Sequence, residues 1–264
     1  MEYFWTSWEA VKDRIGTRTL MLFLDFDGTL APIVSRPEDA SLPEETRNLL
    51  EGLSQKEPCK VAIVSGRTVA DVKQKTGIEG FVYVGNHGLE IDGKGIRYTA
   101  DIGERYSDTL RQVKLQLQSG IEGYKGAFIE DKGLTLSVHF RLVGFDRIVS
   151  LRERIRDAVL PYSRKNQIKV RSGKMVIEIR PPVSFNKGTA VLWLIDKWRE
   201  MYGHIDAVAL YCGDDSTDED AFTALKGNGV TILVGHNEDS AAQYYLNSQD
   251  EVNDLLSHIV SLGQ

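Results

Sequence analysis

The stretch LMLFLDFDGT at residues 20–29 decides the fold, because five consecutive apolar residues run directly into two carboxylates and a glycine. An apolar run without alternation is typical of a strand that is covered on both faces, as in a parallel sheet flanked by helices. The segments 61–65 (VAIVS) and 207–215 (AVALYCGDD) repeat this pattern. Two further apolar runs, 81–84 and 230–234, indicate two more strands of the same sheet.

Helical patterns alternate with these strands, for example at residues 44–53 and 189–202. Strands that alternate with helices predict an α/β class protein with a doubly wound parallel-sheet core. In such sheets ligands bind in the crevice outside the carboxyl ends of the strands. The polar clusters that follow the three main strands are therefore expected to share one crevice.

The middle of the chain departs from this rhythm. We expect a helix at 104–118, strands at 126–130 and 134–142, a second helix at 146–159, and strands at 167–170 and 174–179 joined at Ser172-Gly173. Residues 134–139 alternate between apolar and polar, which is typical of an antiparallel sheet with one open face. The sequence thus predicts an inserted α+β cap domain at 101–183, within a core formed by 1–100 and 184–264.

The net charge and the lengths of the apolar stretches argue against nucleic acid and membranes as partners. The chain has 264 residues and a formal net charge of −6, so it lacks the basic field that gathers nucleic acid or acidic lipid. No apolar stretch approaches the roughly 20 residues that cross a bilayer, and the first 16 residues lack the apolar centre of a signal peptide. We expect a cytoplasmic monomer. Cys59 and Cys212, in or beside apolar runs, are expected to be buried structural residues.

Two acidic clusters indicate a metal site. Asp25 and Asp27 are two residues apart at a strand end, so both carboxylates can face one crevice while Gly28 turns the backbone away. The second cluster follows another strand and includes Asp214, Asp215 and Asp218. Repulsion among so many carboxylates is relieved by a hard cation, and oxygen ligands suit Mg²⁺. An ordinary turn at Asp27-Gly28 and an acid-rich helix start after Asp214 are the structural alternatives.

Two further groups indicate a phosphoryl ligand. Ser65-Gly66-Arg67 offers a hydroxyl and backbone N–H groups at a predicted helix start, an arrangement that binds anions. Lys187 precedes the helix expected from about Thr189 and adds a positive charge, although most lysines are solvated at the surface. Together with Mg²⁺ and a nucleophilic carboxylate, these groups suit phosphoryl transfer.

The order of these motifs resembles the four-motif signature of the haloacid dehalogenase superfamily of phosphotransferases. An insertion between the serine and lysine motifs is similar to the larger α+β cap of some members. More narrowly, the strings LFLDFDGTLAPIV, VAIVSGR, VGNHGLE, VHFR, GKMVIEIRP, FNKG and CGDDSTDEDAF resemble the trehalose-6-phosphate phosphatase family along nearly the whole chain.

The resemblance implies roles for the core residues. Asp25 is then the nucleophile that forms an aspartyl-phosphate, and Asp27 is the general acid and then the base, a pairing that also fits two carboxylates with different protonation states. Mg²⁺ is held by Asp25, the backbone carbonyl of Asp27 and Asp214, with Asp215 and Asp218 as ligands, water-holding groups or orienting groups. Ser65, Gly66 and Lys187 hold the phosphate.

The resemblance also implies a sugar-binding set, formed by Arg67, Asn86, His87, Glu130, Lys132, Arg141, Lys174 and Glu178. Fixed charged donors and acceptors suit the hydroxyls of a disaccharide. A surface salt bridge between Lys174 and Glu178 within one strand is the alternative for that pair, and His139 is expected either to contact the sugar or simply to pack. Phe140 stands where the family usually has tyrosine.

The sequence therefore predicts a Mg²⁺-dependent phosphomonoesterase that acts on a sugar phosphate, and the resemblance implies trehalose 6-phosphate. Another glycosyl phosphate, such as a mannosyl- or glucosyl-phosphoglycerate or a hexose phosphate, is the nearest alternative. A non-catalytic sugar-phosphate sensor is the alternative from a different class. It needs a defect that the sequence does not show, because Asp25, Asp27, Lys187 and Asp214 are all present.

Overall fold

The computed structural model of the chain describes residues 1–203 and 205–262. The chain divides into two compact units, one formed by Met1–Thr99 with Phe185–Gln264 and the other by Ala100–Ser184. Each unit has its own sheet and its own hydrophobic core.

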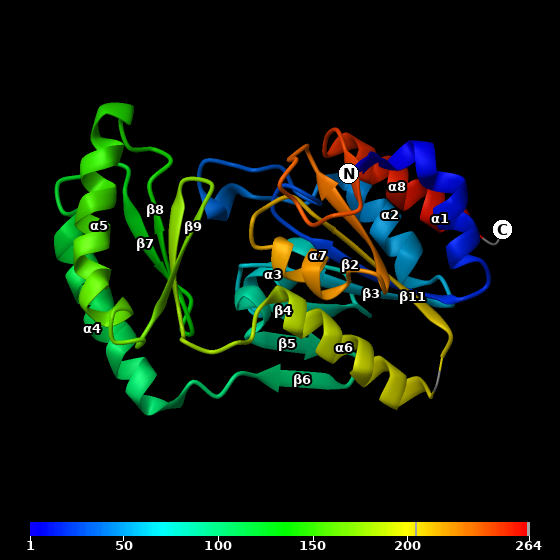
Figure 1. The fold of residues 1–264 in the computed structure, drawn as a ribbon, viewed down its shortest axis with the longest axis horizontal. Coiled ribbons are helices and arrows are strands. Elements are labelled where there is room, and N and C mark those ends of the chain that lie inside the picture. The colour runs from blue at the N-terminus through cyan, green and yellow to red at the C-terminus, as the bar shows by residue number, and fades with distance from the viewer. Residues whose placement is uncertain (204, 263–264) are drawn as a thin grey trace. The chain divides into compact units, whose positions relative to one another are not determined.

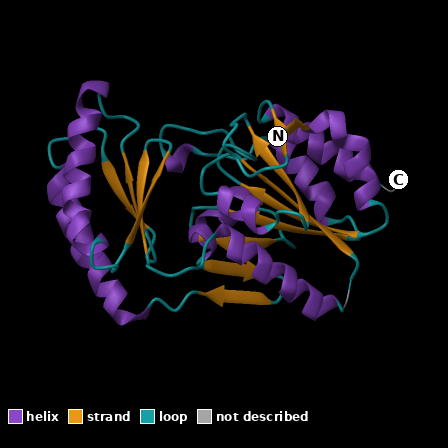
Figure 2. Cartoon of the chain, viewed as in Figure 1, coloured by secondary structure: helices purple, strands orange, loops and turns teal. Residues whose placement is uncertain are grey.

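The first unit is built on a nine-stranded sheet (Figures 1 and 2). The first seven strands across the sheet are parallel to one another, and the last two form a hairpin at one edge that is antiparallel to the seventh strand and within itself. The order across the sheet is β1 (Glu2–Tyr3), β13 (Tyr244–Leu246), β12 (Gly229–Val234), β11 (Ala207–Gly213), β2 (Thr19–Asp25), β3 (Cys59–Val64), β4 (Val82–Gly85), β5 (Glu90–Gly93) and β6 (Ile96–Thr99).

Helices cover both faces of this sheet, which explains why its central strands are apolar throughout. Alternate residues of β2 point to opposite faces, so that Leu22 and Leu24 join one buried cluster while Met21 and Phe23 join the other. The first cluster is completed by α1 (Trp8–Ile15), α2 (Glu44–Ser54), α3 (Val69–Thr76) and α8 (Asp250–Ser261), and the second by α6 (Lys187–Tyr202) and α7 (Glu219–Ala224). The predicted doubly wound α/β core is confirmed.

Both cysteines and the aromatic residue Phe4 pack in the first buried cluster. Cys59 and Cys212 are buried, as expected, and both are free cysteines. Phe4 is fully buried, with Trp5 and Trp8 packed against the same cluster.

The second unit is a four-stranded antiparallel sheet with the order β7 (Phe128–Asp131), β8 (Leu136–His139), β10 (Val176–Arg180) and β9 (Lys169–Gly173). Two long helices, α4 (Gly103–Ile121) and α5 (Ile148–Ser163), share its hydrophobic core. Val138 and Ile177 lie opposite each other in the sheet and both belong to this core. Neighbouring residues along each strand therefore point to the face that the helices leave open.

The start of one helix and the position of one turn differ from the prediction, and one hairpin was missed. Helix α6 begins at Lys187 rather than near Thr189, because the Asn186 side chain caps it by accepting a hydrogen bond from the Thr189 N–H group. The turn between β9 and β10 lies at Lys174-Met175 rather than at Ser172-Gly173, so Lys174 is a turn residue and not a strand residue. The hairpin of β5 and β6 was not predicted.

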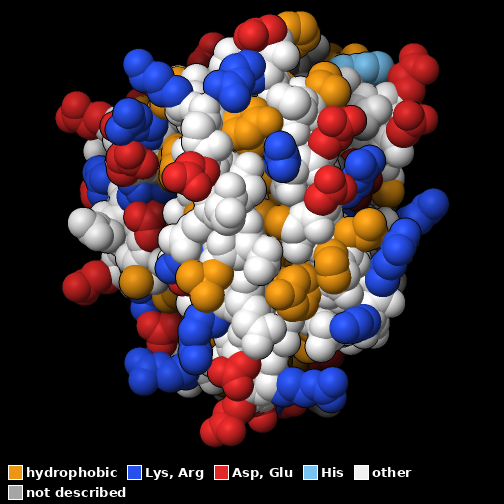
Figure 3. Space-filling view, turned by 90° about the vertical axis from the view of Figure 1, so that its left-hand side faces the viewer, with side chains coloured by type: hydrophobic (Ala, Val, Ile, Leu, Met, Phe, Trp, Pro, Cys, Tyr) orange, Lys and Arg blue, Asp and Glu red, His pale blue; other side chains and the backbone are white. Residues whose placement is uncertain are grey.

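Among the described residues, no helix is long and apolar enough to cross a membrane. On the face drawn in Figure 3, basic and acidic side chains are interspersed, with hydrophobic side chains between them. This mixture agrees with a net charge that is only moderately negative.

Candidate active site

Three neighbouring parallel strands of the first unit deliver the predicted motifs to one edge of the sheet. In the sheet, β2 lies between β11 and β3, and Asp25 is the last residue of β2. Ser65 directly follows β3, and Asp214 directly follows β11. Because the register pairs Leu24 with Cys212 and Asp25 with Val64, Asp214 and Ser65 lie one residue beyond the level of Asp25.

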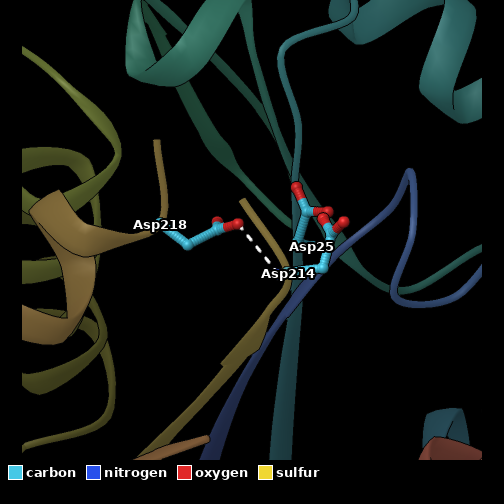
Figure 4. A group of neighbouring side chains, drawn as sticks. All are labelled: Asp25, Asp214 and Asp218. Atoms are coloured by element: carbon cyan, nitrogen blue, oxygen red, sulfur yellow. Dashed lines mark hydrogen bonds between the residues drawn. The ribbon is translucent and has the colours of Figure 1, made fainter. Parts of the chain in front are cut away.

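The acidic cluster consists of Asp25, Asp214 and Asp218, each with a carboxylate oxygen within 4.8 Å of the others (Figure 4). Gly28 makes room for it. Its φ of +91° suits glycine, and a Cβ atom there would lie 2.2 Å from Oδ2 of Asp214. The expected turn at Gly28 therefore brings the chain after Asp27 against the second acidic motif.

Lys187 is buried against the acidic cluster and forms ion pairs with two of its members. It is 2% exposed, and its Nζ donates hydrogen bonds to Oδ1 of Asp25 at 2.6 Å and Oδ1 of Asp218 at 2.7 Å. The alternative of a solvated surface lysine is therefore wrong. Because α6 starts at this residue, the capping box of Asn186 and Thr189 sets the position of the ammonium group.

Burial makes the electrostatics of the cluster strong. It lowers the pKa of Lys187, but the carboxylates of Asp218 and Asp25 outweigh this, so that the pKa lies above its usual value and the side chain is a cation. Burial raises the pKa of Asp25 well above its usual value, Lys187 opposes the shift, and Asp218 and Asp214 add to it. The cluster brings three carboxylates close to one lysine, so a further positive charge would offset the repulsion that remains among them.

Asp218 is held by four donors. Its Oδ1 accepts hydrogen bonds from Lys187 and from the hydroxyl of Tyr211, at 2.5 Å for the latter. Its Oδ2 accepts from the backbone N–H groups of Asp214 at 3.1 Å and Asp215 at 3.0 Å. A carboxylate has about four lone-pair sites, so the contacts of Asp218 within the protein use them all. Asp215 is partly exposed and accepts a hydrogen bond from its neighbour, the Ser216 N–H group.

The Ser65 loop and the Asn86 loop pack tightly on each other. Ser65 is 1% exposed, and its carbonyl accepts a hydrogen bond from the N–H of His87 at 3.0 Å, while Asn86 N–H donates to the carbonyl of Arg67 at 2.6 Å. A Cβ atom at Gly66 would lie 2.3 Å from Cε1 of His87. We expected Ser65 at the start of a helix. Helix α3 begins only at Val69 and is capped by Thr68, so Ser65 lies in the loop before it.

Asp27 and Arg67 form an ion pair that was not predicted. Nε and Nη2 of Arg67 donate to Oδ2 and Oδ1 of Asp27, both at 2.8 Å, and Nη1 donates to Oδ2 of Asp71 at 2.6 Å. Burial lowers the pKa of Arg67, but these two carboxylates outweigh it and hold the pKa above its usual value. Nothing in the sequence pairs Asp27 with Arg67, which lies 40 residues further on.

In the second unit, the open face of the sheet carries a polar row. The register places Glu130, Ser137, Glu178 and Arg171 opposite one another on successive strands, with alternate residues facing the helices. Nε2 of His139 lies 2.8 Å from Oε2 of Glu130, and the ring of Phe128 stacks on His139 at a centroid distance of 4.8 Å. His139 therefore packs against Phe128 and also contacts Glu130, one of the predicted sugar-binding residues.

The remaining predicted sugar ligands of the second unit lie along the same sheet. Nζ of Lys132 lies 3.8 Å from Oε2 of Glu130, and Arg141 donates to the backbone carbonyl of Lys174 at 2.8 Å. Glu178 is 8% exposed and accepts hydrogen bonds from Arg180, which the sequence did not single out although it is two residues away on the same face. Phe140 is fully buried in the core of this unit.

The chain resembles proteins of one known family. Residues 23–250 match the family described as trehalose-phosphatase. The chain is 33% identical over 255 residues to the trehalose-phosphate phosphatase of Mycobacterium tuberculosis H37Rv, covering 95% of this chain and 63% of that protein. It is 35% identical over 245 residues to the enzyme of the same name from Mycobacterium marinum, covering 91% and 61%. The chain thus spans less than two thirds of the length of these relatives.

Solved structures agree as well. The C-terminal domain of Candida albicans trehalose-6-phosphate phosphatase has the same fold, with a TM-score of 0.82 at 23% identity over 96% of each chain. A crystal structure described as a trehalose-6-phosphate phosphatase related protein has a TM-score of 0.74 at 29% identity, covering 92% of this chain and 98% of that one. On the extent of the sequence match, this chain belongs to the trehalose-phosphatase family.

Proposed function

We propose that this protein hydrolyses a sugar phosphate, trehalose 6-phosphate in the first place, to the free sugar and inorganic phosphate. The observation that carries the proposal is the buried Lys187, which bridges Asp25 and Asp218 beside Asp214 at adjacent strand ends. Family membership supports trehalose 6-phosphate over other sugar phosphates. Two buried carboxylates, a partly buried third and a buried lysine suit phosphoryl transfer, in which a nucleophile and positive charge are held in place around the phosphoryl group.

The donor set suits a divalent cation with a preference for oxygen, such as Mg²⁺. Asp25 and Asp214 would hold it with the backbone carbonyl of Asp27, and the ion would neutralise charge on the phosphoryl oxygens. Asp218, whose lone pairs already accept four hydrogen bonds, suits the role of orienting Lys187 and the Asp214 loop. Asp215 stays a candidate for holding metal-bound water.

In the proposed reaction, an ionised oxygen of Asp25 attacks phosphorus, and the bond from phosphorus to the sugar oxygen breaks. The sugar oxygen takes a proton from Asp27, which leaves an aspartyl-phosphate on Asp25. Asp27, now ionised, accepts a proton from water as the water attacks phosphorus, and phosphate leaves Asp25 in its original state. Lys187 offsets the negative charge of Asp25 and of the phosphoryl group. Ser65 and Gly66 are further hydrogen-bond donors to the phosphoryl oxygens.

The polar row of the second unit supports recognition of the sugar. Glu130 and Glu178 are aligned across the sheet, and each has a partner that fixes its side chain, His139 for the first and Arg180 for the second. Carboxylates held in this way accept hydrogen bonds from sugar hydroxyls at defined positions. Lys132, Arg141 and Lys174 would supply donors from the same unit, and Asn86 and His87 from the first.

A panel of phosphate esters tests the proposal. We expect phosphate release from trehalose 6-phosphate with Mg²⁺ at a kcat/KM well above that for glucose 6-phosphate or a glycosyl phosphoglycerate. A higher value for another ester in the panel would transfer the assignment to that substrate. Binding of trehalose 6-phosphate without turnover of any ester, 4-nitrophenyl phosphate included, would support the sensor instead.

The metal requirement has its own test. Excess chelator should abolish phosphate release, and Mg²⁺ should raise the Tm of the wild type because it relieves repulsion in the folded state alone. Asp214→Asn should lose most of that rise in Tm, whereas Asp239→Asn, a substitution at an exposed position outside the cluster, should keep it. Full activity in excess chelator would contradict the metal assignment. A cytoplasmic location and a monomeric state stay predictions.

A further inference from the structure

Arg67 is fixed from several directions. Its side chain is 8% exposed, and its guanidinium lies 5.5 Å from the centroid of the Phe26 ring. Its backbone N–H donates to Oγ of Ser65 at 3.1 Å, and its carbonyl accepts from the N–H of Asn86 at 2.6 Å. The backbone of Arg67 cannot move without breaking its contacts with Ser65 and Asn86, and its side chain cannot move without breaking those with Asp27 and Asp71.

Asp71 holds the far side of the guanidinium. It lies in the first turn of α3, and its backbone N–H donates to the side chain of Thr68, the N-cap residue of that helix. Its carboxylate accepts a hydrogen bond from Nη1 of Arg67 at 2.6 Å. The guanidinium of Arg67 thereby links the start of α3 to Asp27 through hydrogen bonds.

Asp27 itself is held mainly by this pair. Its side chain is 38% exposed, compared with 6% for the side chain of Asp25. Both of its carboxylate oxygens accept hydrogen bonds from Arg67 in a two-point contact, which fixes the plane of the carboxyl group as well as its position. Without Arg67, a side chain exposed to this extent would sample several rotamers.

The same contacts make Arg67 a poor ligand for substrate phosphate. Nε, Nη1 and Nη2 all donate to carboxylate oxygens of Asp27 and Asp71. A phosphate that bound this guanidinium would have to displace one of these two partners. The geometry favours a role in orienting Asp27 over the substrate-binding role that we expected from the sequence.

We propose that Arg67 is a positioning residue that orients Asp27 for proton transfer to the leaving group, with Asp71 as its second anchor. The inference rests on the proposed phosphatase function. Proton transfer from a fixed acid requires its oxygen to lie within hydrogen-bond reach of the leaving oxygen. Sugar alcohols leave poorly without a proton, whereas nitrophenolate hardly needs one. Loss of the orientation should therefore affect alkyl phosphates selectively.

The test compares kcat and KM for glucose 6-phosphate and 4-nitrophenyl phosphate in Arg67→Lys and Asp71→Asn. Since general acid catalysis contributes about 10²–10⁴-fold, we expect kcat/KM, which excludes the shared hydrolysis of the aspartyl-phosphate, to fall about tenfold or more further for the alkyl ester than for the aryl ester in Arg67→Lys, and by a smaller factor in Asp71→Asn. KM should change little. Asp92→Asn is the matched control, because Asp92 pairs with Lys73 of α3 away from Asp27 and should leave the ratio of the two rates unchanged.

A second comparison asks whether Arg67 acts through Asp27. In the Asp27→Asn background, Arg67→Lys should not change the ratio of alkyl to aryl rates further, because the orienting target is gone. A further selective loss, or a rise in KM with unchanged kcat, would overturn the proposal in favour of direct substrate binding. Equal losses on both esters would overturn it in favour of a structural role.

The proposed function can fail separately. Wild-type protein that hydrolyses the two test esters but not trehalose 6-phosphate would contradict the substrate assignment, while the ratio still decides the role of Arg67. Wild-type protein that hydrolyses no ester would overturn both.

Discussion

At the scale of single residues, Tyr211 shows how the acidic cluster is assembled. Its hydroxyl donates to Asp218 at 2.5 Å, and both side chains are fully buried. Burial raises the pKa of Tyr211 well above its usual value, and the charges of Asp218 and Asp25 add to this, so the hydroxyl stays protonated and remains a donor at neutral pH. Asp218 in turn holds Lys187 and two backbone N–H groups.

We expect Tyr211→Phe to lower the free energy of unfolding by about 1.5–3 kcal/mol, the range for a lost hydrogen bond to a charged group. Denaturant titration measures this. Tyr106→Phe is a matched control, because the hydroxyl of Tyr106 donates to a neutral carbonyl, that of Leu134, at 3.0 Å. Its loss should be about 0.5–1.5 kcal/mol. Equal losses in the two variants would contradict a special role for the contact with Asp218.

The sequence predicted which carboxylates lie close together, but not which side chains form ion pairs with one another. Asp25 ends β2 and Asp214 directly follows the adjacent strand β11, so the sheet topology brings these two together, and the short loop after β11 adds Asp218. The pairing of Asp27 with Arg67 depends on the rotamers of both side chains and on the packing of α3, which no local pattern encodes. Tyr211 was read only as part of an apolar strand, although a tyrosine two residues before Gly213 offers the one hydroxyl of that strand.

At the scale of elements, the close approach of α6 and α7 sets the position of Lys187. A Cβ atom at Gly188 would lie 2.1 Å from the backbone oxygen of Asp220, so any larger residue forces the start of α6 away from α7. Backbone atoms cannot yield as a flexible side chain can. The glycine after Lys187 is therefore part of the site although it offers no functional group.

We expect Gly188→Ala to lower the Tm and to reduce kcat at least tenfold, because Lys187 moves with the first turn of α6. Gly52→Ala in α2 is the matched control. Its new Cβ would meet only Val260 side-chain atoms at 3.6 Å, so the substitution should be neutral or stabilise by about 0.5–1 kcal/mol. Thermal unfolding and steady-state kinetics check both variants. Wild-type activity in Gly188→Ala would show that Lys187 does not depend on this packing.

The long buried strands were predictable, and the short elements were not. The run 20–24 lies within β2, which is buried on both faces, so its apolar character reflects its environment directly. Ser172-Gly173 is a common turn pair, but the chain instead turns at Lys174-Met175 with Met175 at a φ of +66°, which few sequences would indicate. Strands β5 and β6 have four residues each, too few to establish a period.

At the scale of the whole molecule, the groups proposed for phosphoryl transfer and most of those proposed for sugar binding belong to different units. The groups proposed for phosphoryl transfer all belong to the unit of residues 1–99 and 185–264, and the row with Glu130 and Glu178 belongs to the unit of residues 100–184. Substitutions in the second unit should therefore affect substrates that carry a sugar and spare those that do not.

We expect Glu178→Ala and Lys174→Ala each to reduce kcat/KM for trehalose 6-phosphate by about tenfold to a hundredfold, as one lost polar contact of about 1.5–3 kcal/mol implies. Activity on 4-nitrophenyl phosphate should stay within a few-fold. Asp157→Ala, at an exposed position on α5, is the control and should change neither rate. Parallel losses on both substrates would assign Glu178 and Lys174 to stability, and no loss on either would remove them from the sugar site.

The most direct test of the whole account is the rate of phosphate release from trehalose 6-phosphate by the wild type and by Asp25→Asn, with Mg²⁺ present. An amide has nearly the same shape as the carboxylate but cannot form the acyl phosphate, so we expect a folded variant whose turnover falls to background. Circular dichroism and thermal unfolding establish that the variant is folded. Substantial phosphate release by a folded Asp25→Asn protein would contradict the proposed nucleophile and, with it, the mechanism built on this cluster.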